Sequence, residues 1–212
     1  MTTTSTPKAG TRTIPPRAIL GLLAPAALTM IGAQLANPGF DPSWRPISDY
    51  ALGNQGWLMT ICFLAWGAAV TLAAVRLWPM ATSRLARTGI VLLTIGGLGP
   101  IIAGIFPGEL STAPTAGPGL HALGAVLPDL GAIGAVLLWI AMARKPDLLG
   151  SPRELGIATV LVWLTIIGLT VALACFAPDG VLGPDAPIGW PNRAVVVGQW
   201  VLALALARLP RR

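Results

Sequence analysis

Six apolar stretches of membrane-spanning length divide this chain. They cover residues 18–36, 56–75, 88–106, 120–142, 155–176 and 191–209. At 1.5 Å per helical residue each stretch is roughly 28–35 Å long, which matches the hydrocarbon thickness of a bilayer. We expect helices, because unpaired backbone groups are prohibitive in lipid and no alternating barrel pattern is present. The sixth stretch is short and has Arg193 near its start.

The composition excludes an ordinary water-soluble globular protein. Charged residues make up 10% of the 212 and hydrophobic residues 54%, whereas soluble domains carry about 25% charged residues. The net charge of +6 does not predict nucleic-acid binding. The basic residues flank apolar stretches and do not form one surface interleaved with aromatic residues. We therefore expect no nucleic-acid partner.

Lys and Arg are distributed asymmetrically over the gaps between the stretches. Only Arg45 and Arg193 fall on one side, and the other twelve fall on the opposite side. The positive-inside rule then places both termini in the cytoplasm. We expect an all-α, multi-pass protein of the plasma membrane. Residues 1–17 form a cytoplasmic tail, residues 18–209 one six-helix domain, and residues 210–212 the cytoplasmic end.

The three gaps on the outer side are longer than the cytoplasmic ones. They cover residues 37–55, 107–119 and 177–190, and they are rich in Pro and Gly. The acidic residues in these gaps are Asp41, Asp49, Glu109, Asp179 and Asp185. Binding and catalytic groups tend to collect on the long loops of one face. We therefore expect any functional site on or below the outer surface.

Asp129 lies near the centre of the fourth stretch, directly after Pro128. An aspartate at that depth costs about 2.5–3.5 kcal/mol on insertion scales. Pro128 also frees the carbonyl of Gly124 from its helical hydrogen bond. The pattern predicts a polar pocket at mid-depth, where Gln199 or Thr165 could satisfy the carboxyl group. Two interpretations of Asp129 stay open: a hydrogen-bonded tie between helices, or a proton- or ligand-linked role.

His121 is the only histidine, and it opens the fourth stretch on the outer side. Asp49 and Glu109 could approach it if the outer loops fold over the bundle. One His with two carboxylates could hold a metal or serve in acid–base catalysis, so these three are the candidate catalytic residues. The alternative is an interfacial histidine that caps local structure. We expect no cofactor and no metal.

Arg45 and Arg193 are the only cations on the outer side. Either can pair with Asp49 or Glu109, or can hold a lipid phosphate. The expected ligand-binding set is Asp49, Glu109, His121, Arg45 and Arg193, with Asp129 and Gln199 as polar residues inside the membrane. Asp49 has a second interpretation, because Ser48 or Asp49 could N-cap a short helix.

Glycines recur inside the apolar stretches. They are Gly67, Gly89, Gly96, Gly97, Gly124, Gly131, Gly134 and Gly168. Small residues let helix backbones approach closely in lipid. We expect these positions to be sites of close helix packing.

Short motifs in the outer gaps resemble those of a known membrane family. Residues 37–42 read Asn-Pro-Gly-Phe-Asp-Pro, residues 47–53 read Ile-Ser-Asp-Tyr-Ala-Leu-Gly, and residues 106–109 read Phe-Pro-Gly-Glu. With His121 opening the fourth stretch, the chain is similar to the prokaryotic family of domain of unknown function 998. It is more weakly similar to the Frag1/DRAM/Sfk1 membrane proteins. The acid comes one residue later than in a strict Phe-Pro-Asp. The resemblance implies that Asp49, Glu109 and His121 belong to one outer site, and it supplies no reaction.

We therefore predict a multi-pass membrane protein that binds a membrane lipid or a small amphipathic molecule at an outward-facing polar site. Three alternatives stay open: an enzyme acting on lipid head groups, a proton-linked carrier that uses Asp129, and a structural scaffold. Nothing in the sequence predicts an oligomeric state.

Overall fold

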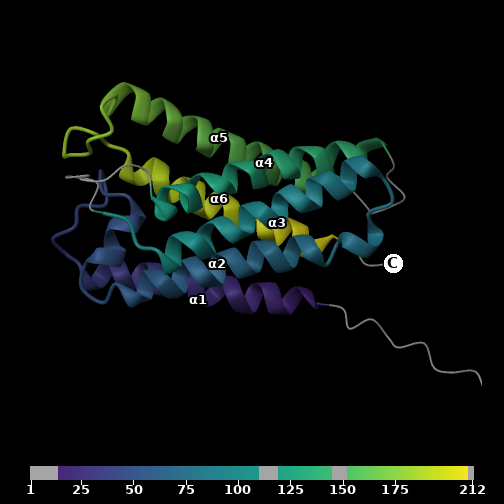
Figure 1. Cartoon of the computed structure of the whole chain (residues 1–212), viewed down its shortest axis with the longest axis horizontal. Coiled ribbons are helices and arrows are strands. Elements are labelled where there is room, and N and C mark those ends of the chain that lie inside the picture. The colour runs from purple at the N-terminus through teal and green to yellow at the C-terminus, as the bar shows by residue number, and fades with distance from the viewer. Residues whose placement is uncertain (1–13, 110–118, 145–151, 210–212) are drawn as a thin grey trace, which may run out of the picture.

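The computed structural model describes residues 14–109, 119–144 and 152–209, and these residues form helices and no strand. The helices lie side by side as one bundle (Figure 1). In chain order they are α1 Pro16–Ala36, η1 Ile47–Leu52, α2 Trp57–Val75, η2 Trp78–Met80, α3 Arg84–Ile105, α4 Leu120–Arg144, α5 Arg153–Phe176 and α6 Gly189–Arg208. The all-helical prediction is thus confirmed.

Long helices that follow one another run in opposite directions, so their ends gather at two ends of the bundle (Figure 1). We call the end that holds residues 37–56 and 177–188 the η1 end. Of the described basic residues, Arg45 and Arg193 lie at the η1 end. The others lie toward the opposite end: Arg17, Arg76, Arg84, Arg87, Arg144, Arg153 and Arg208. The predicted separation of charge is therefore present in the fold.

Five helices in the described parts of the chain, α1 to α5, are long and apolar enough to cross a membrane. The prediction of six spans is supported for these five. Helix α6 forms where the sixth stretch was expected but lies outside this set, because Asn192, Arg193 and Gln199 lower its hydropathy. Arg193 and Gln199 are only 6% and 2% exposed, so their polar groups face the protein. That α6 crosses the membrane stays a prediction.

Glycines bring α3 and α4 into close backbone contact. A Cβ at Gly134 would lie 2.5 Å from the carbonyl oxygen of Gly89, and a Cβ at Gly96 would lie 2.6 Å from the Cα of Gly131. Gly99 and Gly124 form a third contact of the same kind. No larger residue fits at such distances without displacing backbone. The packing prediction is confirmed for these helices.

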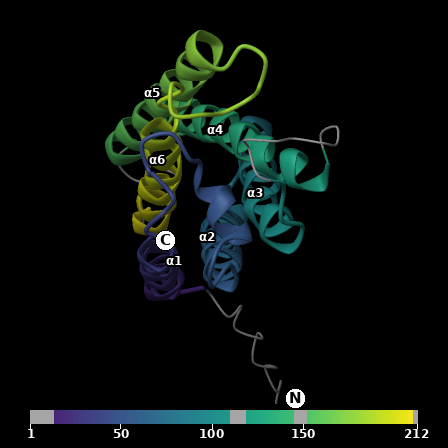
Figure 2. The same cartoon turned by 90° about the vertical axis from the view of Figure 1, so that its left-hand side faces the viewer.

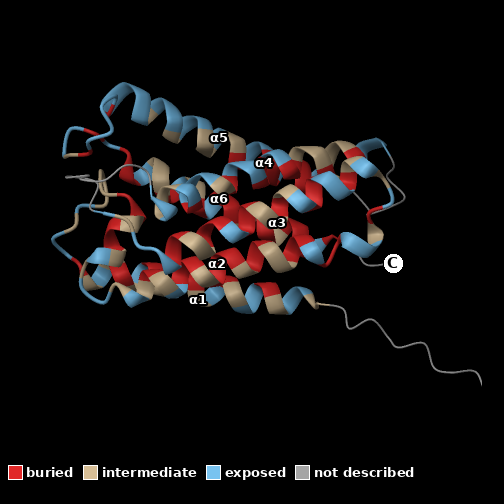
Figure 3. Cartoon of the chain, in the orientation of Figure 1, coloured by how far each residue is buried: buried red, intermediate tan, exposed pale blue. Residues whose placement is uncertain are grey.

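Gly168 of α5 is the exception among the predicted packing glycines. A Cβ at this position would meet nothing within 4 Å. The buried residues of α5 all lie between Leu155 and Val162, in the half away from the η1 end. The other half of α5 is mostly exposed or half-buried (Figure 3). The packing prediction for Gly168 is therefore wrong, because this position of α5 faces away from the neighbouring helices.

Arg76 ties the opposite end of the bundle together. Its guanidinium group is buried and donates hydrogen bonds to the carbonyls of Leu206, Ala207 and Leu209. These carbonyls belong to the last turn of α6, where helical partners are missing. A cation at a helix C-terminus also interacts favourably with the partial negative charge of the helix dipole there. Arg76 therefore fixes α6 beside α2.

Candidate functional site

Residues 37–56, which we call the η1 loop, fold back on themselves at the η1 end of the bundle. The side-chain amide of Asn37 donates to the carbonyls of Ala33 and Asn54, each at 2.8 Å. The amide oxygen of Asn37 accepts a 2.6 Å hydrogen bond from the Asn54 backbone N–H. Gly53 lies directly against the Asn37 side chain and leaves no room for a Cβ. Asn37 thus closes the two ends of the loop.

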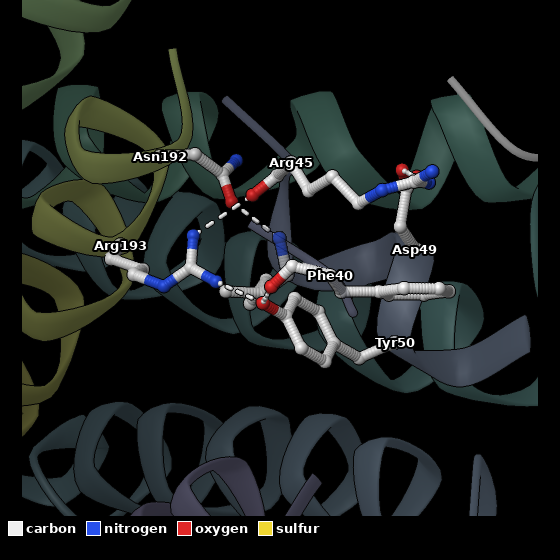
Figure 4. A network of polar contacts seen from close by, with 7 residues as sticks. Phe40, Arg45, Asp49, Tyr50, Asn192 and Arg193 are labelled. Atoms are coloured by element: carbon white, nitrogen blue, oxygen red, sulfur yellow. Dashed lines mark hydrogen bonds and ion pairs between the residues drawn. The ribbon is translucent and has the colours of Figure 1, made fainter. Parts of the chain in front are cut away.

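Arg193 of α6 anchors the η1 loop from inside the bundle (Figure 4). Its Nε donates to Gln34 Oε1 at 2.8 Å, and its Nη2 donates to the Tyr50 hydroxyl at 3.1 Å. Its Nη1 donates to the carbonyls of Pro42, Arg45 and Gly189 at 3.1, 2.9 and 2.9 Å. A planar guanidinium group suits such a set of converging oxygens. The guanidinium group of Arg193 is therefore hydrogen-bonded to the protein's own backbone and side chains.

Tyr50 lies between Arg193 and the start of the loop. Its hydroxyl donates to the Phe40 carbonyl at 2.9 Å, and the Phe40 and Tyr50 rings pack edge-on at 5.3 Å. Burial raises the pKa of Tyr50 above its ordinary value, and the positive charge of Arg193 opposes that rise only in part. The phenol is therefore held in its neutral, hydrogen-bonding form.

Asn192 adds a second tie between α6 and the loop. Its side-chain oxygen accepts a 2.9 Å hydrogen bond from the backbone N–H of Ile47 (Figure 4). Ile47 begins η1, where backbone N–H groups have no helical partner. The Asn192–Arg193 pair thus holds both halves of the loop.

Arg45 and Asp49 form an ion pair within the loop. Arg45 Nη1 lies 3.0 Å from Asp49 Oδ2, and the Asp49 side chain is completely buried. The Arg45 guanidinium group also lies over the rings of Phe40 and Trp44, at 4.3 and 4.5 Å. The predicted pairing of Arg45 with Asp49 is confirmed. The suggestion that Ser48 or Asp49 caps a helix is wrong, because η1 begins after Pro46 and no side chain caps it.

His121 is fixed against the end of α3. Its Nδ1 lies 3.1 Å from the Ala103 carbonyl oxygen and 3.0 Å from that of Phe106. A ring nitrogen that faces two carbonyl oxygens must carry a hydrogen, so Nε2 is the acceptor in the neutral ring. Gly108 allows this approach, because a Cβ there would lie 2.8 Å from His121 Cδ2. His121 therefore caps the last turn of α3, as the structural alternative for this residue predicted.

The three candidate catalytic residues have different surroundings. Asp49 is buried beside Arg45, His121 lies on the end of α3, and Glu109 is exposed. Within the described ranges, no group of three or more His, Cys, Asp or Glu residues could hold a metal ion. The described residues therefore offer no facial-triad ligand set.

A cavity of about 360 Å³ lies between the η1 loop and helices α2 to α6. Most of its walls are apolar. The polar residues among its described lining are Ser48, His121, Asp129, Thr170 and Asn192. That lining includes neither Asp49 nor Glu109, and it includes none of Arg45, Arg193 and Gln199. The structure thus brings His121 and Asp129 to one space, with Ser48 of the loop above them.

The cavity opens sideways between α4 and α5. These helices diverge toward the η1 end in both views (Figures 1 and 2). Val126, Asp129 and Leu173 line the cavity and are also exposed at the surface of the chain. A residue that is both lining and exposed lies at an opening, so the gap faces whatever surrounds α4 and α5.

Gln199 reaches the level of Asp129, as its position in the sequence predicts. Its Nε2 donates to the Pro128 carbonyl at 3.4 Å. The Thr165 hydroxyl instead donates to the Val162 carbonyl of its own helix, at 2.8 Å. Neither side chain donates to the carboxyl group of Asp129.

Several residues of the loop and cavity were missed from the sequence. Tyr50, Asn37 and Asn192 hold the loop, and Thr170 and Trp66 line the cavity. The adjacent polar pair Asn192-Arg193 in an apolar stretch was a usable signal for the anchor. Thr170 and Trp66 carry no such signal, because single threonines and tryptophans are common in apolar helices.

Five helices able to cross a membrane, packed through glycine contacts around a laterally open cavity, are the features of a helical membrane protein. The chain belongs to the DUF998 family, which is described as a protein of unknown function and whose sequence model matches residues 19–209. The resemblance drawn from the loop motifs is therefore confirmed. The similarity to the Frag1/DRAM/Sfk1 proteins finds no support. No curated protein and no solved structure matches the chain.

Proposed function

We propose that this protein binds a membrane lipid or a small amphipathic molecule in the cavity between α4 and α5. The observation that carries the proposal is the cavity itself, which is walled by apolar side chains and open to the side. Its volume falls within the range of about 300–1,000 Å³ that small-molecule sites occupy. Apolar walls with a few polar groups suit a ligand that has an apolar body and a polar end.

We further propose that the protein lies in the plasma membrane with both termini in the cytoplasm and α6 as the sixth span. The basic residues at the end away from η1 support this orientation, since Lys and Arg favour the cytoplasmic side. The η1 loop would then lie on the outer side and cover the cavity. A ligand could enter from the lipid between α4 and α5 without crossing the loop.

In this proposal the charged residues of the loop position it, and the cavity residues contact the ligand. Pro46, Ile47 and Ser48 line the cavity. Arg193 and the Arg45–Asp49 pair hold that segment in place. His121 and Asp129 supply the polar contacts to the ligand. The exposed Glu109 lies outside the described cavity lining, and we assign it no contact.

Native mass spectrometry of the protein in mild detergent tests the proposal. We expect the wild type to carry a bound molecule, which can be released and identified. Leu173→Trp should displace it by filling the cavity. Leu164→Trp is the matched control, since Leu164 is an exposed leucine of the same helix that is absent from the described lining. A clean mass for the wild type, unchanged by added membrane lipids, would contradict lipid binding.

An enzyme acting on lipid head groups is a second candidate, and the placement of His121 favours it. The imidazole lines the cavity while Nδ1 is engaged, which leaves Nε2 as the one basic nitrogen. Such an enzyme should lose turnover of lipid in His121→Gln but keep lipid binding. Equal turnover in the wild type and this variant would remove the candidate.

A further inference from the structure

The cavity holds an acidic residue without a matching cation. Asp129 lies in its lining, and no Arg or Lys is among the described lining residues. At 1.5 Å per residue, Asp129 lies about 14 Å along α4 from Leu120, and apolar residues surround it along the helix. An isolated carboxylate in such a medium is costly. A group of opposite charge is therefore the partner that this position lacks.

The outer cations and the amide that was expected to satisfy Asp129 all have other partners. Arg45 pairs with Asp49, and Arg193 donates to the η1 loop. The Gln199 amide donates to the Pro128 carbonyl. In the described parts of the chain, the Asp129 carboxyl group has no hydrogen-bond or ion-pair partner.

Two neighbouring groups in the lining also act as acceptors. His121 uses its Nδ1 hydrogen on the carbonyls of Ala103 and Phe106. The Thr170 hydroxyl donates to the Ile166 carbonyl at 2.9 Å, which leaves its oxygen only lone pairs to offer. Ser48, the amide N–H₂ of Asn192 and the indole N–H of Trp66 are the donors that remain, and all three belong to neutral groups. Among the described lining residues, Asp129 is therefore the one carboxylic acid, and it has no cationic side chain beside it.

On the basis of the function proposed above, we propose that the ligand is a small amphipathic amine whose protonated nitrogen pairs with the Asp129 carboxylate. An ammonium group is a donor without acceptors and carries the charge opposite to that of the Asp129 carboxylate. Phe63 and Trp66 line the same cavity, and aromatic faces attract cations. An anionic head group would instead face a carboxylate with no cation beside it.

Three amphiphiles with the same chain and different head groups test this inference: octylamine, octanol and octanoate. Their binding to the full chain in a non-ionic detergent can be followed by tryptophan fluorescence, since Trp66 lines the cavity. We expect octylamine to bind about tenfold more tightly than octanol, and octanoate to bind most weakly. Asp129→Asn should remove the advantage of the amine over octanol. Asp129→Glu should keep part of it.

Asp179→Asn is the matched control, because it removes an exposed carboxylate that is not among the described lining residues. It should behave as the wild type. Octanoate binding as tightly as octylamine would overturn the amine inference, and so would an amine advantage that survives Asp129→Asn. In both cases the proposed binding function would still be supported if octanol binds to the wild type and this binding is lost in Leu173→Trp. Failure of all three amphiphiles to bind would overturn both proposals.

Discussion

A buried arginine in the first turn of α6 keeps its charge because all three of its nitrogen atoms meet oxygen atoms. The oxygens come from α1, the η1 loop and α6 itself, as Gln34, Tyr50 and Gly189 illustrate. Leaving such acceptors unpaired in a buried place costs more than each bond contributes. Arg193 therefore determines the position of the η1 loop.

Replacing Arg193 should loosen the loop. We expect Arg193→Gln to lower the free energy of unfolding by about 3 kcal/mol, because several buried oxygens lose their donor. Arg193→Lys should recover little of this, since an ammonium group cannot reproduce the planar set of donors. Denaturant titration in detergent measures the change. Arg208→Gln, at an exposed position, should stay within about 0.5 kcal/mol of the wild type. If Arg193→Gln leaves the free energy of unfolding unchanged, contacts other than those of Arg193 hold the loop.

Tyr50 is the only tyrosine in the chain, so its ionisation can be observed alone. Its pKa is raised by burial. A group whose pKa is raised in the folded state contributes stability below its unfolded pKa and loses it as the pH rises through the folded value. We expect tyrosinate absorbance to appear above about pH 10, with unfolding in the same range. A midpoint at or below the ordinary tyrosine value would contradict the buried, neutral phenol.

Helices α3 and α4 pack backbone against backbone through glycines, whereas α5 does not pack in this way at Gly168. Helices α3 and α4 touch through Gly89 and Gly134, whereas a Cβ at Gly168 of α5 would meet nothing within 4 Å. Close contact maximises dispersion between backbones where lipid supplies no hydrophobic drive. Helices α4 and α5 diverge toward the η1 end, where residues of both helices line the cavity (Figures 1 and 2).

The same substitution should have opposite effects at these two glycines. Gly134→Ala places a methyl group 2.5 Å from the Gly89 carbonyl oxygen, so we expect a loss of about 1–3 kcal/mol. Gly168→Ala meets nothing within 4 Å and should be neutral or stabilising by up to about 1 kcal/mol, because alanine favours the helix. Denaturant titration of both variants measures the difference. Equal effects would contradict the close packing of α3 on α4.

At the scale of the whole molecule, the described ends of the chain lie together. Pro16 begins α1 and Arg208 ends α6 at the end of the bundle away from η1 (Figure 1). The six crossings that we propose would place both ends on one side of the membrane, and the basic residues of that end support this proposal. The five most apolar helices alone would leave the two ends on opposite sides.

Cysteine labelling in intact cells tests this topology. In a background without the exposed Cys175, we expect an impermeant maleimide to label Gly39→Cys and Trp190→Cys from outside. Trp78→Cys and Arg208→Cys, at the opposite end, should react only after the membrane is permeabilised. Labelling of Trp190→Cys and Arg208→Cys from the same side would show that α6 does not cross.

Much of the fold could be predicted from sequence, because hydropathy and charge act locally. The apolar stretch at 120–142 matches α4. The pairing of Arg45 with Asp49 could also be predicted, because the two residues are four apart in the chain. The site was harder to predict. Asp49 and His121 were expected to share it, but Asp49 faces Arg45, while His121 lines the cavity with Asp129. Side-chain direction in a 3₁₀ turn cannot be derived from composition or spacing.

Hydropathy and charge along the chain predict the helices and the gathering of most basic residues at one end, since lipid penalises unpaired backbone and charge wherever they occur. These patterns predict neither the divergence of α5 from α4 nor the cavity that is lined by Ser48, His121, Asp129 and Thr170. These residues come from segments far apart in the chain. Their meeting depends on where glycines let backbones touch and where Arg193 fixes the loop, which are properties of the packed bundle.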